Sequence, residues 1–182
     1  MLQSREHSDL HPELKIIAET SQNLINFVEG YRTFTRVRTP DKRVFELRPL
    51  AERLVALHCD NVKTQLDIDP NDLMLHADID QIEQVLANLL RNSTQAVEAV
   101  PGAQIQIKAT VCANETIRLS VRNNGSAIPP EIADDIFLPF FTTKPEGNSI
   151  GLSRARQIMQ LHGGAIQLAA NRDGEVEFVL LF

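Results

Sequence analysis

Four side-chain amides follow one another at helical spacing between residues 84 and 95. Gln84, Asn88, Asn92 and Gln95 are separated by four, four and three positions, which places them in one row along a helix. An amide oxygen is a hard, neutral ligand that Mg²⁺ accepts while it keeps phosphate oxygens and water. The row therefore predicts either a magnesium site, with Asn92 best placed, or the more ordinary alternative, a solvated flank of the helix.

A second candidate segment runs from Asn123 to Pro129, directly after a predicted strand that ends at Val121. A polar residue at the end of a strand, followed by Gly125, lets a side chain face a pocket while the backbone turns away beneath it. The same residues also suit a common Asn-Gly turn. Both interpretations stay open on this pattern alone.

A third candidate segment, Thr142 to Gly151, is rich in turn-forming residues and leads into a predicted helix. The start of a helix presents free N–H groups and the positive end of a dipole, which suits phosphate. Lys144 would then be a mobile counter-charge. The alternative is a surface loop in which Ser149 merely caps the helix.

These segments need helices and strands to position them. Asp78 is a suitable cap for a long helix to about Val100, stopped by Pro101 and Gly102. Alternating apolar residues predict a hairpin of two strands over 104–111 and 117–121. Further helices are expected at 50–58 and 150–162, and further strands at 62–68, 73–77, 165–170 and 175–181. The pattern predicts an α+β fold, with one sheet, rich in antiparallel pairs, covered on one face by helices.

The first part of the chain has a different pattern. Apolar residues at three- and four-residue spacing draw one stripe along a helix of roughly 25 residues, which suits a hairpin or a dimeric bundle. The stripe comprises Leu14, Ile17, Leu24, Val28 and Tyr31. Proline and charge then interrupt the helical period. We therefore expect a partial dimerisation helix over 1–38, a linker over 39–44 and a separate domain over 45–182.

Composition limits the partners. The chain has 182 residues, 43% of them apolar, and 24 acidic against 18 basic residues give a net charge of −6. Such a surface repels nucleic acid and anionic membranes, so neither is expected as a partner. Two cysteines are too few for a disulfide framework, and the longest apolar run has five residues, so no direct membrane insertion is expected. A cytoplasmic location follows, with an inner-membrane anchor elsewhere in the intact protein left open.

Taken in order, four segments resemble the N box, first glycine box, F box and second glycine box of the ATP-binding domain of sensor histidine kinases, in the GHKL ATPase superfamily. They are NLLRNSTQAV (88–97), NNGSAIP (123–129), FLPFFTTKPEG (137–147) and GNSIGLSRARQIMQLHGG (147–164). The resemblance covers about Phe45 to Phe182. The segment ETSQNLINFVEGYRTFTR (19–36) is similar to the second helix of the dimerisation bundle in kinases of the nitrogen-regulator sensor type.

The resemblance implies a Bergerat-type two-layer α/β sandwich, with a mixed, mostly antiparallel sheet and helices on one face. It implies Mg²⁺ and ATP as cofactors and a lid over 138–150. It also implies transfer of the γ-phosphoryl group to a histidine of the protein's own dimerisation bundle, which forms a homodimer in the intact protein. A response regulator is a further implied partner. Asn92 would hold the metal, with Asn88 and Lys144 as further catalytic residues, and Asn123 would face the adenine amino group. The other nucleotide-binding residues implied are Gly125, Ala127, Ile128, Thr142, Thr143, Gly147, Ser149, Ile150, Gly151 and Leu152.

The chain departs from the family pattern at three positions, with Asn123 in place of aspartate and Ala127 and Ser149 in place of glycine. These changes favour an alternative, a degenerate domain that binds nucleotide weakly or not at all and acts as a regulatory docking module. A kinase acting on serine is a third possibility. The position that carries a glutamate in ATP-hydrolysing relatives is Asn88, which cannot act as a general base, so transfer to a protein nucleophile is favoured over hydrolysis.

We also expect the family's phosphoacceptor histidine to be absent from this chain. His7 and His11 lack the preceding helix on which that histidine sits, so they are interpreted as surface residues. The sequence therefore predicts a fragment that begins after the first bundle helix.

Overall fold

The computed structural model describes residues 14–18, 20, 21, 24, 25, 28, 37–113, 115–139, 141 and 150–182. The chain divides into two units, residues 1–36 and residues 37–182. In the first unit the described positions are helical, and Leu14, Ile17, Leu24 and Val28 of the predicted stripe are exposed there. Tyr31, His7 and His11 lie outside the described residues. Dimerisation through this stripe stays a prediction.

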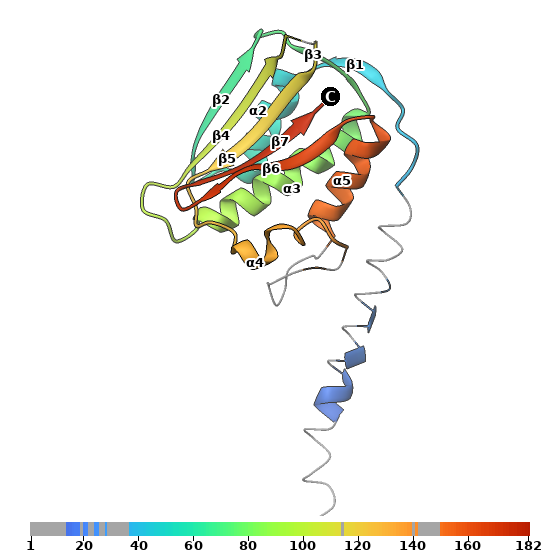
Figure 1. The fold of residues 1–182 in the computed structure, drawn as a ribbon, viewed down its shortest axis with the longest axis vertical. Helices are drawn as coiled ribbons and strands as arrows, with labels where there is room; N and C mark the ends of the chain where they lie inside the picture. Colours follow the sequence, from blue (N-terminus) through green and yellow to red (C-terminus); the bar gives the residue numbers. More distant parts are fainter. Residues whose placement is uncertain are drawn as a thin grey trace, which may run out of the picture. The chain divides into compact units, whose positions relative to one another are not determined.

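The second unit contains the sheet and its helices (Figure 1). In chain order its elements are β1 (Arg43–Glu46), α2 (Leu47–His58), β2 (Lys63–Asp69), β3 (Met74–Ala77), α3 (Ile79–Val97), β4 (Gln104–Val111), β5 (Ile117–Asn123), α4 (Pro130–Ala133), α5 (Gly151–Leu161), β6 (Ala165–Arg172) and β7 (Glu175–Leu181). The predicted strands and long helices are therefore confirmed, with ends shifted by a few residues.

Five strands form one mixed sheet in the order β2-β4-β5-β7-β6. The predicted hairpin is confirmed, since β4 and β5 pair antiparallel with Ile107 opposite Val121. β2 and β4 are parallel, with Leu66 opposite Ile107. A parallel pair needs a long crossover, and the segment that carries α3 supplies it. The sequence predicted both strands but not this pairing.

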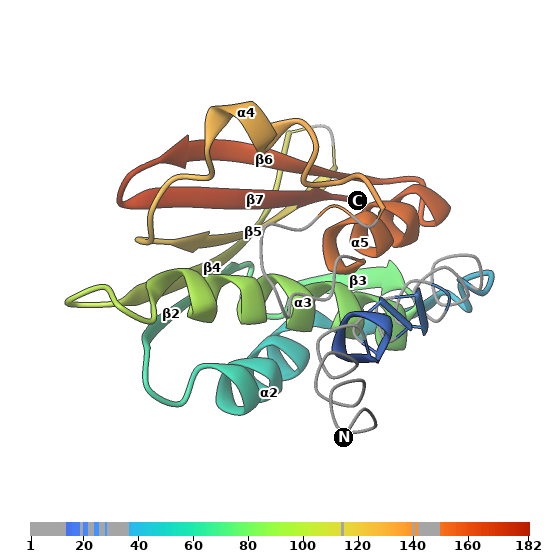
Figure 2. The ribbon, with the colours of Figure 1, turned by 90° about the horizontal axis from the view of Figure 1, so that it is seen from below.

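Helices cover one face of the sheet, so the fold is the predicted two-layer α+β arrangement (Figure 2). Alternate residues of the central strands point into the core, among them Ile105, Ile107, Leu119 and Val121, all at most 1% exposed. They pack with Ile82, Leu86 and Leu89 of α3 in one apolar cluster. The intervening residues form ion pairs on the outer face, such as Arg118 with Glu177. This alternation is the period-two pattern of a half-buried strand.

A second, two-stranded sheet was not predicted. β1 pairs antiparallel with β3, from Arg43 opposite Ala77 to Glu46 opposite Met74. The strand begins within the segment 39–44, for which a linker was predicted. β1 has only four residues, and of its two apolar side chains Phe45 is half-buried while Val44 is exposed. The conformation of β1 therefore depends on backbone pairing with β3, which is distant in sequence. No local pattern of residues predicts such a pairing.

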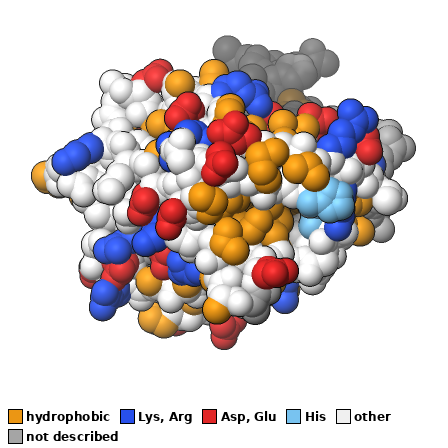
Figure 3. Space-filling view, turned by 90° about the horizontal axis from the view of Figure 1, so that it is seen from above, with side chains coloured by type: hydrophobic (Ala, Val, Ile, Leu, Met, Phe, Trp, Pro, Cys, Tyr) orange, Lys and Arg blue, Asp and Glu red, His pale blue; other side chains and the backbone are white. Residues whose placement is uncertain are grey.

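The surface seen from above Figure 1 mixes acidic and basic side chains around a group of apolar ones, with a histidine beside them (Figure 3). Exposed apolar residues of the second unit include Val44, Met74 and Val111. Among the helices that the structure describes, none combines the length and apolar character needed to cross a membrane.

Candidate functional site

Helix α3 positions the row of amides. Asp78 is its N-cap, as predicted, and the Asp78 carboxylate accepts a hydrogen bond from Gln81 N–H at 3.2 Å. The apolar side of the helix is buried, but Ala96, predicted on that side, is exposed. Within the row, Asn88 and Asn92 are half-buried whereas Gln84 and Gln95 are exposed. The two ends of the row therefore form the solvated flank, and the middle lies against other parts of the protein.

Asn88 lies against the first residue of α5. A Cβ atom at Gly151 would stand only 2.1 Å from Asn88 Oδ1 and 2.8 Å from its Cγ, so only glycine allows this approach without movement. The Asn88 Nδ2 atom is buried and has no hydrogen-bond partner among the described residues. α3 and α5 pack against each other. The structure thus brings together an amide of the N box and a glycine of the second glycine box.

Among the described residues, no side chain caps the N-terminus of α5. Its N-cap residue is Ile150, whose side chain cannot accept a hydrogen bond from the helix. Ser153 Oγ instead donates to the Ile150 carbonyl at 3.0 Å. The N–H groups of the first turn have no partner within an α-helix, so Gly151 and Leu152 present donors and the positive end of the helix dipole. A phosphate site at this helix N-terminus stays a prediction.

Arg154 and Arg156 follow in the same helix. The Arg154 Nε atom is buried without a partner in the described part of the chain, and burial lowers the pKa of its guanidinium group. Arg156 is exposed, and its guanidinium carbon lies 5.8 Å from the centre of the Phe137 ring. Phe137 in turn meets Phe178 edge to face, with 6.3 Å between ring centres. The F box is therefore attached to the core at its first residue.

Asn123 ends β5 with a buried side chain, 4% exposed. Its Oδ1 atom accepts from Gly125 N–H at 3.0 Å, and its Nδ2 atom donates to Ser93 Oγ of α3 at 3.4 Å. A Cβ at Gly125 would lie 2.6 Å from the Ala96 carbonyl oxygen, which explains glycine at this position. The predicted sharp turn under a polar side chain is present.

The loop after Asn123 keeps an ordinary backbone at Ala127. Glu115, Gly102, Gly163 and Gly174 are the described residues with positive φ, so alanine at position 127 introduces no left-handed strain. Ala127 and Ile128 are half-buried. The remaining predicted site residues, Thr142, Thr143, Lys144, Gly147 and Ser149, with most of the predicted lid, lie outside the described residues.

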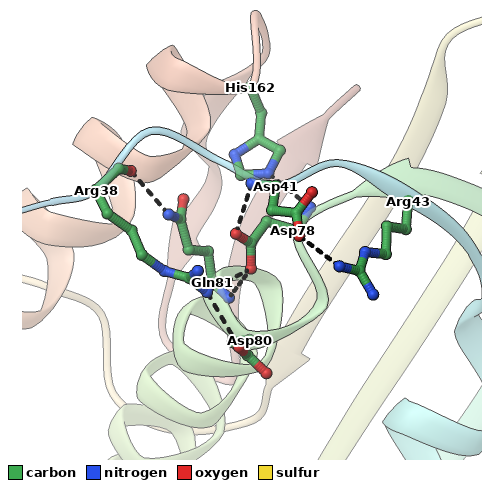
Figure 4. A network of polar contacts seen from close by, with 7 residues as sticks. All are labelled: Arg38, Asp41, Arg43, Asp78, Asp80, Gln81 and His162. Carbon is green, nitrogen blue, oxygen red and sulfur yellow. Dashed lines mark hydrogen bonds and ion pairs between the residues drawn. The ribbon is translucent and has the colours of Figure 1, made fainter.

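A polar network at the other end of α3 was missed in the sequence (Figure 4). The Asp78 carboxylate, in a residue 2% exposed, accepts from Asp41 N–H at 2.9 Å and from Arg38 Nη2 at 3.2 Å. Gln81 Nε2 donates to the Arg38 carbonyl at 2.9 Å. Asp80 Oδ2 accepts from Arg38 Nη2 at 3.0 Å, so Asp78, Asp80 and Gln81 together hold the segment 38–41. The sequence signal for this network was an acidic N-cap residue, Asp78, followed three residues later by Gln81. The residues that these two contact lie far away in the sequence, so the pattern did not identify them.

Comparison with known proteins shows the family. Residues 77–182 match the family model described as histidine kinase-, DNA gyrase B-, and HSP90-like ATPase. The sensor protein FixL of Bradyrhizobium diazoefficiens is 31% identical over 166 residues, covering 88% of this chain and 33% of FixL. The sensory histidine kinase/phosphatase NtrB of Escherichia coli is 34% identical over 178 residues, covering 90% of this chain and 50% of NtrB.

Solved structures show the same relationship. The catalytic domain of histidine kinase ThkA superposes with a TM-score of 0.70 and 34% identity, covering 78% of this chain and 95% of that one. ThkA in complex with the response regulator protein TrrA gives a TM-score of 0.70 at 30% identity, covering 97% of this chain and 52% of ThkA.

This chain belongs to the histidine kinase-like ATPase family and has the ATP-binding GHKL domain of sensor histidine kinases. It spans between a third and a half of the length of the two sensor proteins named above.

Proposed function

We propose that this chain binds Mg-ATP between α3 and the N-terminus of α5 and passes the γ-phosphoryl group to a histidine of a dimerisation bundle. The observation that carries the proposal is the contact between Asn88 and Gly151, where a Cβ would stand 2.1 Å from the amide oxygen. This contact brings one amide of α3 to the N-terminus of α5, where no side chain among the described residues caps the helix. Both a metal and a phosphate chain can be held where two such elements meet.

The donor set fits a magnesium-bound triphosphate. Asn92 would hold the metal through its amide oxygen, and Asn88 Nδ2, buried without a partner among the described residues, is available to a phosphate oxygen. When bound, Mg²⁺ neutralises phosphate charge as the transferred group moves. The N–H groups of Gly151 and Leu152 would bind the phosphates from the α5 side, and Lys144 would add a counter-charge. These residues position the reactants and balance their charge, which is most of what phosphoryl transfer requires.

Asn123 would contact the base. The adenine amino group is a donor and needs an acceptor, which the Asn123 carboxamide oxygen supplies as a neutral partner. That oxygen accepts from Gly125 N–H in this structure and has a second lone pair. We therefore expect adenine recognition that is weaker than the family's usual aspartate would give.

The acceptor of the phosphoryl group is a protein side chain in this proposal. Activation of water needs a general base, and the neutral amide of Asn88 cannot take a proton. A histidine nucleophile on a helical bundle needs no such base when its imidazole is already neutral. We propose that the intact protein supplies this bundle as a homodimer, works in the cytoplasm and hands the group to a response regulator. A ThkA structure solved with TrrA supports the last step by similarity.

Calorimetric titration with Mg-ATP tests the binding step. Heat is expected from the unaltered chain, with loss of most of the magnesium-dependent affinity in Asn92→Ala. Gln95→Ala is the matched control, because Gln95 lies in the same row but is exposed. A chain that binds no Mg-ATP would sink the proposal.

Phosphotransfer has its own test. A separately produced bundle fragment with the acceptor histidine is mixed with the chain and labelled ATP. Label that is lost in acid and kept in base is expected, since phosphohistidine is acid-labile. Acid-stable label would instead indicate transfer to serine.

A regulatory module that binds nucleotide poorly is the second candidate. It is favoured by Asn123, whose amide is engaged on both sides, by Gly125 N–H and by Ser93 Oγ. Failure of the chain to bind Mg-ATP, together with intact folding, would establish this alternative.

A further inference from the structure

The turn between β6 and β7 holds the segment that follows β5. Asn171 Nδ2 donates to the Ile128 carbonyl at 2.8 Å, and Asn171 Oδ1 accepts from Ile128 N–H at 2.8 Å. Asp173 Oδ1 accepts from Ala127 N–H at 2.9 Å. Gly174 N–H donates to the Gly125 carbonyl at 2.9 Å. The backbone of 125–128 is thus bound at three residues by one hairpin turn, and Figures 1 and 2 show this turn beside the segment joining β5 to α4.

Strand register explains why the turn reaches this loop. Asn123 of β5 lies opposite Val176 of β7, and Val176 lies opposite Asn171 of β6. Residues in one such row point to the same face of a sheet. Asn123 is 4% and Val176 3% exposed, so the row faces the covering helices. Asn123 and Asn171 therefore flank Val176 on either side, with backbones about 10 Å apart. The loop 125–128 is hydrogen-bonded to both of them, through Gly125 and Ile128.

The hydrogen bonds continue from the hairpin turn to the Asn123 carboxamide. Gly125, whose carbonyl is bound by Gly174, donates its N–H to Asn123 Oδ1 at 3.0 Å. The orientation of the carboxamide thus depends on where the backbone of Gly125 lies. Ser93 Oγ contacts the other end of the same carboxamide at 3.4 Å. A shift of the loop would leave Asn123 held only by this longer contact.

We propose that Asn171 and Asp173 are positioning residues for base recognition, which hold the loop 125–128 so that Asn123 keeps the orientation that reads an adenine amino group. The inference rests on the proposed function and deepens it at a hairpin turn outside the N, F and glycine boxes. An amide at position 171 is suited to this role because it donates to one backbone atom and accepts from another. A carboxylate at this position could only accept, and a methyl group could do neither.

A merely structural role of Asn171 would leave base selectivity unchanged, so base selectivity is the quantity to measure. Binding of Mg-ATP is compared with binding of Mg-ITP, whose base carries a carbonyl group in place of the adenine amino group. The unaltered chain is expected to prefer ATP. Asn171→Ala should weaken ATP binding roughly tenfold and bring the ratio of the two affinities close to one, because the loss of two hydrogen bonds frees the loop. The ratio of ATP to ITP affinity in Asn171→Asp should lie between the ratios of the unaltered chain and of Asn171→Ala.

Neighbouring variants serve as controls. Arg172→Ala should bind both nucleotides as the unaltered chain does, because Arg172 is exposed and pairs with Glu175 rather than with the loop. Asp173→Asn keeps an acceptor oxygen and should also behave normally, whereas Asp173→Ala should lose part of the selectivity.

Amide hydrogen exchange tests the same contacts without nucleotide. The Ile128 and Ala127 amides of the unaltered chain are expected to be protected, and Asn171→Ala should expose them. If Asn171→Ala fails to fold, Asp173→Ala and the exchange of the unaltered chain decide the matter. Unprotected Ile128 and Ala127 amides, or unchanged selectivity in Asn171→Ala while the unaltered chain binds ATP, would overturn this inference alone. Absence of ATP binding by the unaltered chain would overturn the proposed function itself, and base recognition with it.

Discussion

The imidazole of His162 accepts a hydrogen bond from the backbone N–H of Asp78, with 3.0 Å between Nε2 and N. The other ring nitrogen, Nδ1, lies 2.8 Å from the Ile158 carbonyl and must therefore donate, which fixes the neutral tautomer. Both residues are buried. The bond joins the C-terminal end of α5 to the start of α3, while Asn88 and Gly151 meet at the opposite ends of this helix contact. The contact between α3 and α5 is thus fixed at both ends of α5, at the start of α3 and at its middle.

Replacement of His162 by alanine is expected to destabilise the fold. The buried N–H of Asp78 would lose its acceptor, which costs about 1–3 kcal/mol. Urea unfolding measures the change, and His76→Ala is the matched control because His76 is exposed on β3. A His162→Ala variant as stable as the control would contradict the importance of this bond.

Asp78 is expected to make folding stability depend on acid pH. Burial by itself raises the pKa of the carboxyl group, but hydrogen bonds from Asp41 N–H and Gln81 N–H, with the Arg38 guanidinium, outweigh it and set the pKa below its ordinary value of 3.8. The folded state therefore favours the ionised form. Its contribution is present above the ordinary pKa and is lost as pH falls through the lowered one.

The Asp78→Asn variant separates this effect from the rest of the protein. Its unfolding free energy should be lower at neutral pH by about 1–2 kcal/mol, because one cap acceptor becomes a donor. As the pH falls below the ordinary pKa of 3.8 the two unfolding free energies should begin to converge, and they should meet only below the lowered pKa, where the carboxyl group is protonated in the folded state as well. Urea unfolding across the acid range measures both. Curves that stay parallel would show that Asp78 is not the titrating group.

Gly151→Ala should disturb Asn88 through direct contact. The added Cβ would meet Asn88 Oδ1 at 2.1 Å, so either the amide or α5 must move. We expect at least a tenfold loss of Mg-ATP affinity under the proposed function, although alanine favours helix by about 1 kcal/mol over glycine. A double-mutant cycle with Asn88→Ala measures the contact, because the smaller side chain leaves room for the methyl group. Additive changes in unfolding free energy would mean that the two residues do not touch.

Asn123→Asp is expected to tighten ATP binding. One carboxylate oxygen would still accept from Gly125 N–H, and the other would accept from the Ser93 hydroxyl group, so the substitution fits the same space. A charged acceptor binds the adenine amino group more strongly than a neutral one. Calorimetry of both forms should show a gain of several-fold, consistent with about 1 kcal/mol. Equal affinities would show that position 123 does not face the base.

Local patterns in the sequence determined most elements of the second unit. Alternation in β4 and β5, the Asp78 cap and the period of α3 each arise from interactions between near neighbours, so they can be read from residue types. The four boxes also led to the prediction that Asn88, Asn92, Asn123 and Gly151 are site residues. For Asn88 and Gly151 the structure adds direct contact.

Tertiary structure alone decided which distant residues meet. β1 forms because β3 supplies backbone partners, and β2 pairs with β4 because α3 returns the chain in parallel. The bonds of Asp78 to Arg38 and His162, and of Asn171 to Ile128, join residues at least 40 positions apart. Such pairings depend on how helices pack on a sheet, and no pattern of neighbouring side chains records that.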